Sequence, residues 1–347
     1  MSAGLLAGFD AVIDVRSPAE YAEDHVPGAL SAPVLDNEER ARVGTLYKQV
    51  SPFDAKKLGA ALVSRNIAHH IEERFASMPR AWKPLVYCWR GGKRSGAMAH
   101  VLREIGWDAW SIEGGYKAYR RFVIDELATL PGQFSYRVIH GTTGSGKSRL
   151  LRSLAQAGAQ VLDLEALAAH RGSVLGTLPG QPQPAQKMFE TLVWDTLRKF
   201  DPARPVFVEG ESKKIGQVQV PEALMHAMRA SECIVLEAGR ATRIALLTGE
   251  YRHFFADPAG LYAQLDCLSG LYGEKAIDEW KALAARGDWD ELVGRLLDDH
   301  YDPAYRRSAL RNFAELPRAR TFRLESPEDA AFAKVAGQLL DHQLAAA

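Results

Sequence analysis

The sequence predicts an α/β protein of two domains, each built on a parallel sheet, with a mostly helical extension at its C-terminal end. Its length of 347 residues suits about two domains. Two strand, glycine-rich loop and helix units occur, at residues 85–105 and 136–156, and a Pro-Gly-Gln break at 131–133 separates them. From Thr248 onward the apolar spacing is mainly helical. We therefore expect domains of residues 1–130 and 131–347.

The composition is that of an ordinary globular protein, with 47% hydrophobic and 25% charged residues. Lysine plus arginine equals aspartate plus glutamate at 43 each, so a nucleic-acid partner must bind a local basic patch. Cys88, Cys233 and Cys267 lack metal-ligand spacing, which indicates a reducing compartment. No apolar run approaches the roughly 18 residues of a membrane span. We expect a cytoplasmic protein without membrane contact.

The first domain opens with a predicted buried strand at residues 10–15. A short helix follows, capped by Ser17 and with Pro18 at its first position. Residues 25–29 form a turn to a further short strand. Polar residues 37–49 predict a helix, and Ser51 caps a long helix that we expect to run to Met78.

The third strand of this domain, residues 85–87, ends at a cysteine in a cationic loop that reads VYCWRGGKRS. Helical spacing from residue 95 to 105 places Cys88 between a strand and a helix N-terminus. Backbone N–H groups and the helix dipole there favour a thiolate. The loop adds two glycines and three cations, and we expect its catalytic residues to be Cys88, Arg90, Gly91, Gly92 and Arg94, with Lys93 adding charge.

The interval from Cys88 to Arg94 has the form Cys-x5-Arg, one position longer than a short sulfur-transfer loop. A wider loop accommodates an oxyanion such as phosphate or arsenate, or a larger chalcogen than sulfur. Cysteine-dependent phosphatases use the same spacing. The loop by itself leaves phosphatase and chalcogen transferase open.

The second domain begins with a strand at 136–140 that leads into GTTGSGKS, a complete Walker A pattern, and then into an amphipathic helix at 149–156. The loop N–H groups suit a diphosphate, the lysine suits terminal phosphate oxygens, and the last serine can reach magnesium. The expected phosphate-binding residues are Gly141, Gly144, Ser145, Gly146, Lys147 and Ser148.

Further strands are expected at 159–164, 205–209 and 233–237, with a helix at 187–200. Glu209 ends one strand where aspartate is usual, which leaves the magnesium requirement open. Arg243 follows the last strand, where a lid over the phosphates is one interpretation. His300 and Asp302 suit either substrate contact or a structural role. We expect Cys233 and Cys267 in the core and a basic tail that includes Arg306, Arg307, Arg311, Arg318, Arg320 and Arg323.

Residues 14–21 (DVRSPAEY), 25–29 (HVPGA), the cysteine loop and 113–116 (EGGY) resemble, in this order, the rhodanese family of sulfur carriers. The resemblance covers roughly residues 5–125. With the P-loop domain, the whole chain resembles the tRNA 2-selenouridine synthase family. The stretches that match are 43–48, 88–92, 170–173, 208–212 and 300–305.

This resemblance implies a tRNA-modifying transferase that converts wobble 2-thiouridine in the anticodon loop to 2-selenouridine. It implies selenophosphate as selenium donor, supplied by another enzyme, and an S-geranyl intermediate made from geranyl diphosphate. Cys88 is then expected to attack selenophosphate and to carry selenium as Cys–S–Se⁻. The P-loop, with Glu209 and Arg243, is expected to bind a diphosphate. Whether that diphosphate belongs to an NTP or to the prenyl donor stays open.

Two other classes of function fit parts of the sequence. One is a phosphatase or arsenate-reductase-like hydrolase that uses Cys-x5-Arg and makes no use of the P-loop. The other is a nucleotide-regulated sulfur-relay or tRNA-binding module, which would retain its binding function without Cys88. Against both stands the observation that the two motifs are complete and that each supplies chemistry the other lacks.

Overall fold

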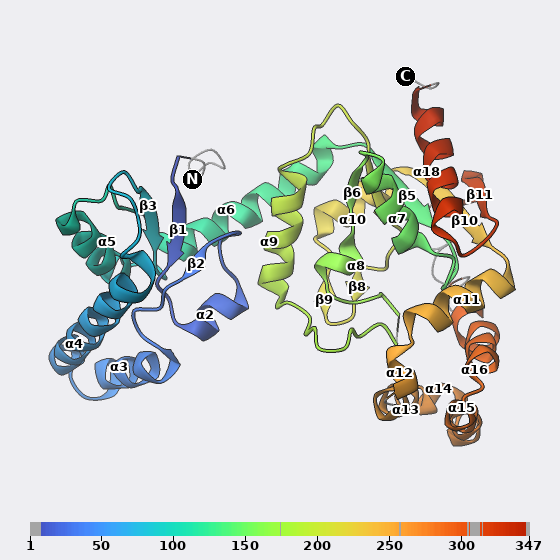
Figure 1. Cartoon of the computed structure of the whole chain (residues 1–347), viewed down its shortest axis with the longest axis horizontal. Coiled ribbons are helices and arrows are strands. Elements are labelled where there is room, and N and C mark those ends of the chain that lie inside the picture. Colours follow the sequence, from blue (N-terminus) through green and yellow to red (C-terminus); the bar gives the residue numbers. More distant parts are fainter. Residues whose placement is uncertain are drawn as a thin grey trace. The chain divides into compact units, whose positions relative to one another are not determined.

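The computed structural model of the chain describes residues 8–173, 175–256, 258–303, 305, 313 and 315–344. The chain divides into two compact units, Met1–Glu126 with Glu190–Asp195, and Leu127–Phe189 with Thr196–Ala347. This division lies close to the expected boundary at residue 131, while the functional assignment of 1–130 and 131–347 stays a prediction. Figure 1 shows the two units and their labelled elements.

The first unit is a parallel sheet of four strands in the order β2-β1-β3-β4. The two central strands carry the motifs, because β1 leads into the Asp-Val-Arg-Ser-Pro segment and β3 leads into the cysteine loop. Its elements are β1 (Ala11–Asp14), α2 (Pro18–Glu23), β2 (Leu30–Ser31), α3 (Asn37–Gln49), α4 (Pro52–His70), β3 (Pro84–Tyr87), α5 (Lys93–Ile105), β4 (Trp110–Ser111) and α6 (Gly115–Thr129).

The second unit has a parallel sheet of five strands in the order β11-β10-β5-β7-β6. Its sheet strands are β5 (Tyr136–His140), β6 (Gln160–Leu162), β7 (Val206–Glu209), β10 (Glu232–Ala238) and β11 (Arg320–Leu324). A small antiparallel pair, β8 (Lys214–Ile215) and β9 (Val218–Gln219), lies outside it.

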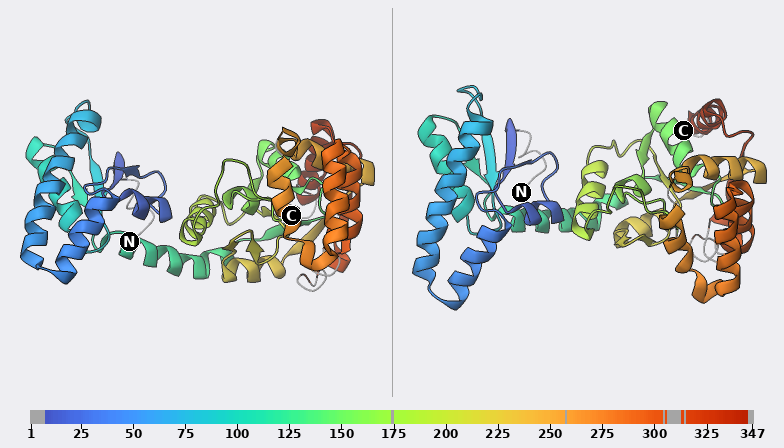
Figure 2. Two further views of the ribbon diagram at one scale, coloured as in Figure 1. Left: turned by 90° about the horizontal axis from the view of Figure 1, so that it is seen from below. Right: turned by 60° about the horizontal axis from the view of Figure 1, so that its bottom comes forward.

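Helices cover this sheet and extend beyond it. Those that lie between β5 and β10 along the chain, or after β11, are α7 (Lys147–Gln156), α8 (Leu164–Leu167), α9 (Gln186–Leu197), α10 (Glu222–Arg229) and α18 (Asp329–Leu344). Figures 1 and 2 show a further group of helices gathered beside the sheet. This helical layer comprises α11 (Arg240–Glu250), α12 (His253–Ala256), α13 (Pro258–Asp266), α14 (Ser269–Tyr272), α15 (Glu274–Arg286) and α16 (Trp289–Leu296).

Each unit buries its own apolar core. In the first, Ile13 and Val86 of the central strands pack with Met98 and Leu102 of α5. In the second, one cluster joins the sheet to α7 and α18, and another fills the helical layer around Trp280. Both cores are contiguous apolar clusters of the kind that stabilise independent domains.

The architecture confirms the predicted α/β class, and it differs from expectation in several places. The helix expected to run to Met78 was predicted too long, since α4 ends at His70 and a π-helical turn continues only to Phe75. The strand predicted for 159–164 ends at Leu162, because the Asp163 carboxylate accepts the Ala166 N–H and caps α8. β11 forms in the basic tail, where no strand was expected. Cys233 is buried as predicted, whereas the prediction for Cys267 was wrong, since it is exposed.

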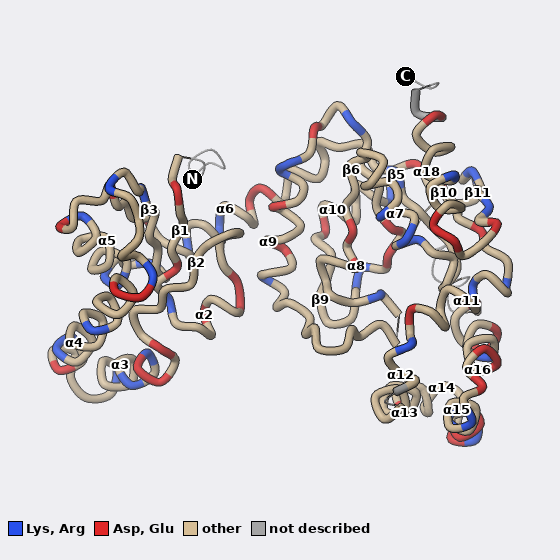
Figure 3. The backbone as a smooth tube through the Cα atoms, viewed as in Figure 1, with Lys and Arg blue, Asp and Glu red and all other residues tan. Residues whose placement is uncertain are grey.

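Basic and acidic residues occur in equal numbers in the chain, and both kinds are present in each unit. Figure 3 shows basic and acidic residues interspersed along both units. Arg306, Arg307 and Arg311 lie outside the described residues. Among the described helices, none is both long and apolar enough to cross a bilayer.

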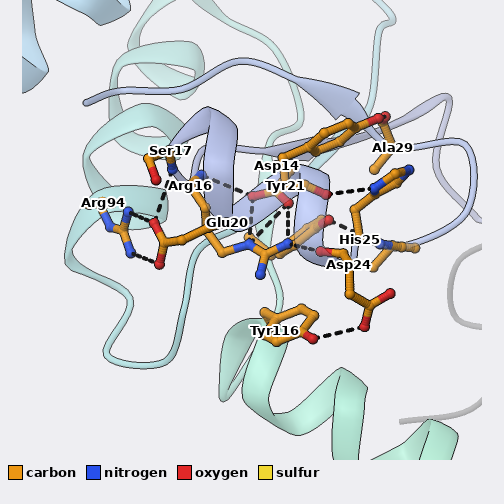
Figure 4. A network of polar contacts seen from close by, with 12 residues as sticks. Asp14, Arg16, Ser17, Glu20, Tyr21, Asp24, His25, Ala29, Arg94 and Tyr116 are labelled. Atoms are coloured by element: carbon orange, nitrogen blue, oxygen red, sulfur yellow. Dashed lines mark hydrogen bonds and ion pairs between the residues drawn. The ribbon is translucent and has the colours of Figure 1, made fainter. Parts of the chain in front are cut away.

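A buried ion pair joins the motifs of the first unit (Figure 4). Arg16 is 1% exposed, and its guanidinium donates to the Asp14 carboxylate at 2.6 Å and to the Asp24 carbonyl at 2.6 Å. It also lies 3.9 Å from the ring centroid of Tyr116, whose hydroxyl donates to the Asp24 carboxylate at 2.8 Å. These contacts tie β1 to the start of α6.

Replacing Arg16 with methionine should lower the free energy of unfolding of the first unit by about 3 to 5 kcal/mol, because Asp14 would remain buried without its partner. Urea unfolding of the full chain followed by tryptophan fluorescence measures this change. Arg65→Met, at an exposed position of α4, is the matched control and should change stability by less than about 0.5 kcal/mol. Equal losses in the two variants would contradict the structural role assigned to the pair.

Candidate functional site

Cys88 lies at the carboxyl end of β3, directly before the loop that leads into α5. The residue is buried, at 3% exposure. Gly92 adopts a left-handed φ of 69°, a conformation that other residues rarely adopt, and α5 begins at the next residue. The Ser95 hydroxyl donates to the Cys88 sulfur at 3.3 Å. The sulfur therefore has a hydroxyl partner in the first turn of α5.

The sequence analysis did not identify Ser95 as a functional residue. It follows the closing arginine of the loop and falls on the first turn of α5, one turn after Gly92. A hydroxyl residue at that position was the available signal, since side chains in a helix's first turn face the same point as its free N–H groups.

The N-terminus of α6 supports the cysteine from the other side. The N–H groups of Tyr116 and Lys117 donate to the carbonyls of Cys88 and Trp89, at 2.8 and 3.0 Å. Gly115 has a φ of 58°, and a Cβ atom there would lie 2.4 Å from the Cys88 carbonyl oxygen. The glycine of the Glu-Gly-Gly-Tyr stretch is therefore required by this close approach.

The cations of the loop differ in their surroundings. Arg94 is held by Glu20 of α2, with 2.8 Å between Nη1 and the carboxylate (Figure 4). Burial of the Glu20 carboxyl opposes its ionisation, but hydrogen bonding to Arg94 and its charge prevail and hold the pKa of Glu20 at about 2. Arg90 and Gly91 are exposed. The closing arginine therefore has its orientation fixed by the first motif.

Trp89, next to the nucleophile, is 41% exposed and stacks on Tyr116 with a centroid separation of 5.4 Å. The Cys88 loop thus combines a buried cysteine, a hydroxyl donor to its sulfur, the N-terminus of a helix and cations. Such an arrangement can activate a nucleophilic sulfur and stabilise an anion bound to it.

The phosphate loop, residues 141–146, connects β5 to α7. It lies where the parallel strands of the second sheet have their carboxyl ends. Gly146 has a φ of 88°, and a Cβ atom there would lie 2.6 Å from the Phe332 ring. Lys147 Nζ donates to the Gly141 carbonyl at 3.0 Å, which places its ammonium group across the loop. The backbone N–H groups and this ammonium form a cradle for an anionic phosphate.

Arg243 is buried and bound to the loop backbone. Its Nε donates to the Thr143 carbonyl at 2.9 Å, and its guanidinium pairs with both oxygens of Asp302 at 3.0 and 2.6 Å. The structure thus places Arg243 as a support of the loop instead of an exposed lid residue. Asp302 fixes this arginine, and the His300 ring contacts the Tyr272 hydroxyl at 2.9 Å, so both have structural partners.

Carboxylates lie beside the same loop. The Ser148 hydroxyl donates to Glu165 at 2.6 Å, and the buried Glu209 carboxylate accepts the Glu165 N–H at 2.6 Å. Burial and the neighbouring Glu211 carboxylate raise the pKa of Glu165 to about 8. Burial and the other acids also raise the pKa of Glu209 well above its usual value.

Glu165 was not identified from the sequence as a site residue. It follows β6, and Glu209 ends the neighbouring strand β7, so both face the same edge of the sheet. That shared edge was the signal available, since the carboxyl ends of adjacent parallel strands lie together. Among the described residues, no three His, Cys, Asp or Glu side chains are placed to share a metal ion.

A pocket of about 650 Å³ opens over the phosphate loop. Lys147, Arg152 and Arg171 contribute positive charge to its lining, and Tyr251 and Tyr301 contribute aromatic surface. Of the predicted phosphate-binding residues, Gly144, Gly146, Lys147 and Ser148 line this pocket, whereas Ser145 is fully buried. The pocket can bind an anionic ligand considerably larger than phosphate.

Comparison with known proteins identifies both units. A model of the rhodanese-like domain matches residues 3–122, and a model described as the tRNA 2-selenouridine synthase AAA domain matches residues 134–260. The two matches together cover most of the chain in the order that the sequence predicts.

Relatives named tRNA 2-selenouridine synthase align with this chain over most of its length. One from Marinobacter nauticus is 35% identical, with 85% of this chain and 87% of the relative covered. One from Nitrosomonas europaea is 40% identical, and the alignment covers 69% of this chain but only 63% of that relative. One from Sulfurovum is 32% identical over 93% of this chain and 94% of the relative.

The predicted resemblance is therefore confirmed: with a rhodanese-like unit ahead of the family's own AAA domain, the chain belongs to the tRNA 2-selenouridine synthase family.

Proposed function

We propose that this chain converts wobble 2-thiouridine in the anticodon loop of tRNA to 2-selenouridine. The observation that carries the proposal is the pairing, in one family member, of a complete nucleophile loop at Cys88 with a complete phosphate loop at Lys147. Mass spectrometry of the wobble nucleoside from cells with and without the gene tests it. Unchanged 2-selenouridine in cells that lack the gene would refute it.

The proposed first step activates the base. Sulfide is a poor leaving group, so the sulfur is first alkylated: it attacks C1 of geranyl diphosphate, the C–O bond breaks, diphosphate leaves, and the N3 proton is lost. The phosphate loop binds the prenyl donor's diphosphate, with Lys147 on its terminal oxygens. Lys147 and the loop N–H groups then stabilise the charge that develops on the leaving group.

In the proposed second step, Cys88 attacks selenophosphate. The selenium of that donor already has the oxidation state of selenide, so forming Cys–S–Se⁻ would require a two-electron oxidant. Attack of the thiolate on phosphorus requires none, because the P–Se bond breaks with its electron pair on selenium. Selenide is released, and the phosphoryl group remains on Cys88, stabilised by the loop N–H groups and Arg94.

The released selenide completes the exchange. It adds to C2 of the alkylated base, and geranylthiolate leaves. Water then hydrolyses the cysteinyl phosphate and restores Cys88. Selenophosphate comes from a separate enzyme that makes it, and we place the reaction in the cytoplasm, where thiols stay reduced.

Replacing Cys88 with alanine should abolish selenium incorporation while S-prenylated tRNA accumulates, because only the second step uses the thiol. Chromatography of nucleosides from tRNA treated with the purified variant measures both products. Cys233→Ala, a buried cysteine of the second unit, is the control and should retain both steps. Loss of both steps in the Cys88 variant would contradict the assigned division.

The same assay identifies the covalent adduct. Selenophosphate labelled on phosphorus should transfer its label to Cys88, whereas selenophosphate labelled on selenium should transfer its label to RNA. Stable labelled selenium on Cys88 would instead support the Cys–S–Se⁻ carrier.

Replacing Lys147 with alanine should lower the rate of prenylation by about 100-fold, because one charged group that stabilises the leaving diphosphate is lost. Selenium incorporation into RNA that already carries the S-geranyl group should be unchanged. Initial rates on 2-thiouridine and on S-geranylated anticodon stem-loops separate the two effects. Wild-type prenylation by the Lys147 variant would contradict diphosphate binding at this loop.

Diphosphate affinity should fall between about pH 7 and about pH 9, because Glu165, with its pKa of about 8, is neutral below that pH and negative above it. Two unit charges about 4 Å apart repel by about 1 kcal/mol in water, which corresponds to about fivefold in Kd. Isothermal titration calorimetry with inorganic diphosphate measures it. Glu165→Gln should show a smaller decrease, and an identical pH profile in both proteins would refute the role of Glu165.

A further inference from the structure

A small apolar cavity adjoins the phosphate pocket of the second unit. It lies in the helical layer, with Leu261, Leu292 and Val293 in its wall, and has a volume of about 40 Å³. Thr143 of the phosphate loop and Leu247 of α11 line both this cavity and the larger pocket. The cavity therefore shares part of its wall with the pocket in which a diphosphate would bind.

Two aromatic residues form part of the wall that the cavity and the larger pocket share. Tyr251 and Tyr301 also line both of them. Beyond these tyrosines, the larger pocket is lined by charged residues such as Lys147 and Glu165, while the cavity wall is formed by leucine, valine and aromatic side chains. The polarity of the lining thus changes from ionic to apolar over the span of one ligand.

The lining excludes a nucleotide base as the favoured occupant of the cavity. Among its described lining residues, the polar groups are the hydroxyls of two threonines and two tyrosines and one indole N–H. No carboxylate or amide is present there to pair with the edge of a base, and buried polar groups without partners are costly. A hydrocarbon group meets no such cost.

We infer that this cavity takes the distal end of an isoprenoid chain whose diphosphate is bound by the phosphate loop, and that it sets the chain length accepted. The inference rests on the proposed prenylation. A volume of about 40 Å³ has room for about three water-sized groups. It therefore suits the branched end of a chain, while the first isoprene unit and C1 remain in the larger pocket, near the base.

Side chains that line the cavity then determine which prenyl donor is accepted. Val293, half-buried on α16, projects into a space that a larger side chain would fill. Leu261 on α13 contributes to the wall, and its truncation would enlarge the space. Filling should penalise donors that reach the cavity, and enlargement should favour longer ones, since each buried methylene adds to binding.

The test measures prenylation of a 2-thiouridine anticodon stem-loop by the full chain with dimethylallyl, geranyl and farnesyl diphosphate. Val293→Phe should lower the ratio of kcat/KM for the geranyl donor to that for the dimethylallyl donor by at least about tenfold. Leu261→Ala should raise the ratio of farnesyl to geranyl use. Leu283→Phe, on α15 outside the cavity, is the matched control and should leave both ratios unchanged.

The outcomes separate this inference from the proposed function. If the wild-type chain uses none of the three donors, the proposed prenylation fails and this inference with it. Both variants are first shown to fold by thermal unfolding. If the wild-type chain prenylates but Val293→Phe and Leu261→Ala change kcat/KM for all three donors by the same factor, the inference alone is overturned. Should Val293→Phe not fold, the farnesyl-to-geranyl ratio of Leu261→Ala decides.

Discussion

Both candidate sites depend on one backbone feature, a glycine with positive φ between the end of a central parallel strand and the start of a helix. Gly92 has a φ of 69° before α5, and Gly146 has a φ of 88° before α7. A side chain in this conformation costs about 1 to 2 kcal/mol, and at Gly146 it would also collide with Phe332. The turn points the first N–H groups of the helix at the residue or ligand that precedes it, so each site gains anion-binding donors without adding net charge.

What the sequence could predict was limited to features encoded within one continuous stretch of the chain. The two strand, loop and helix units, the Ser17 cap and the helix at 37–49 follow from local spacing, and the structure contains them. Contacts between distant segments were not accessible in this way. The pairing of Arg94 with Glu20 joins two motifs that are far apart in the sequence, and the bond from Ser148 joins a motif to Glu165, which belongs to no recognised motif.

The missed strand β11 has a similar cause. It lies at the edge of the sheet, pairs only with β10 there, and exposes both of its arginines. An edge strand tolerates charge on its open side, so its sequence lacks the apolar run by which buried parallel strands are found. Its place is determined by pairing with β10, which the local sequence does not reveal.

The acidic residues beside the phosphate loop have a consistent role under the proposed function. Ionised carboxylates next to a diphosphate would oppose its binding, yet burial and mutual repulsion raise the pKa of Glu165 to about 8 and that of Glu209 well above its usual value. Near neutral pH Glu165 is therefore largely protonated, and it accepts the hydrogen bond of the Ser148 hydroxyl. Its protonation reduces the negative charge beside Lys147 in a pocket that Asp163, Glu211 and Glu250 also line. Such local compensation also explains how a chain with equal numbers of basic and acidic residues can bind anionic substrates in both of its domains.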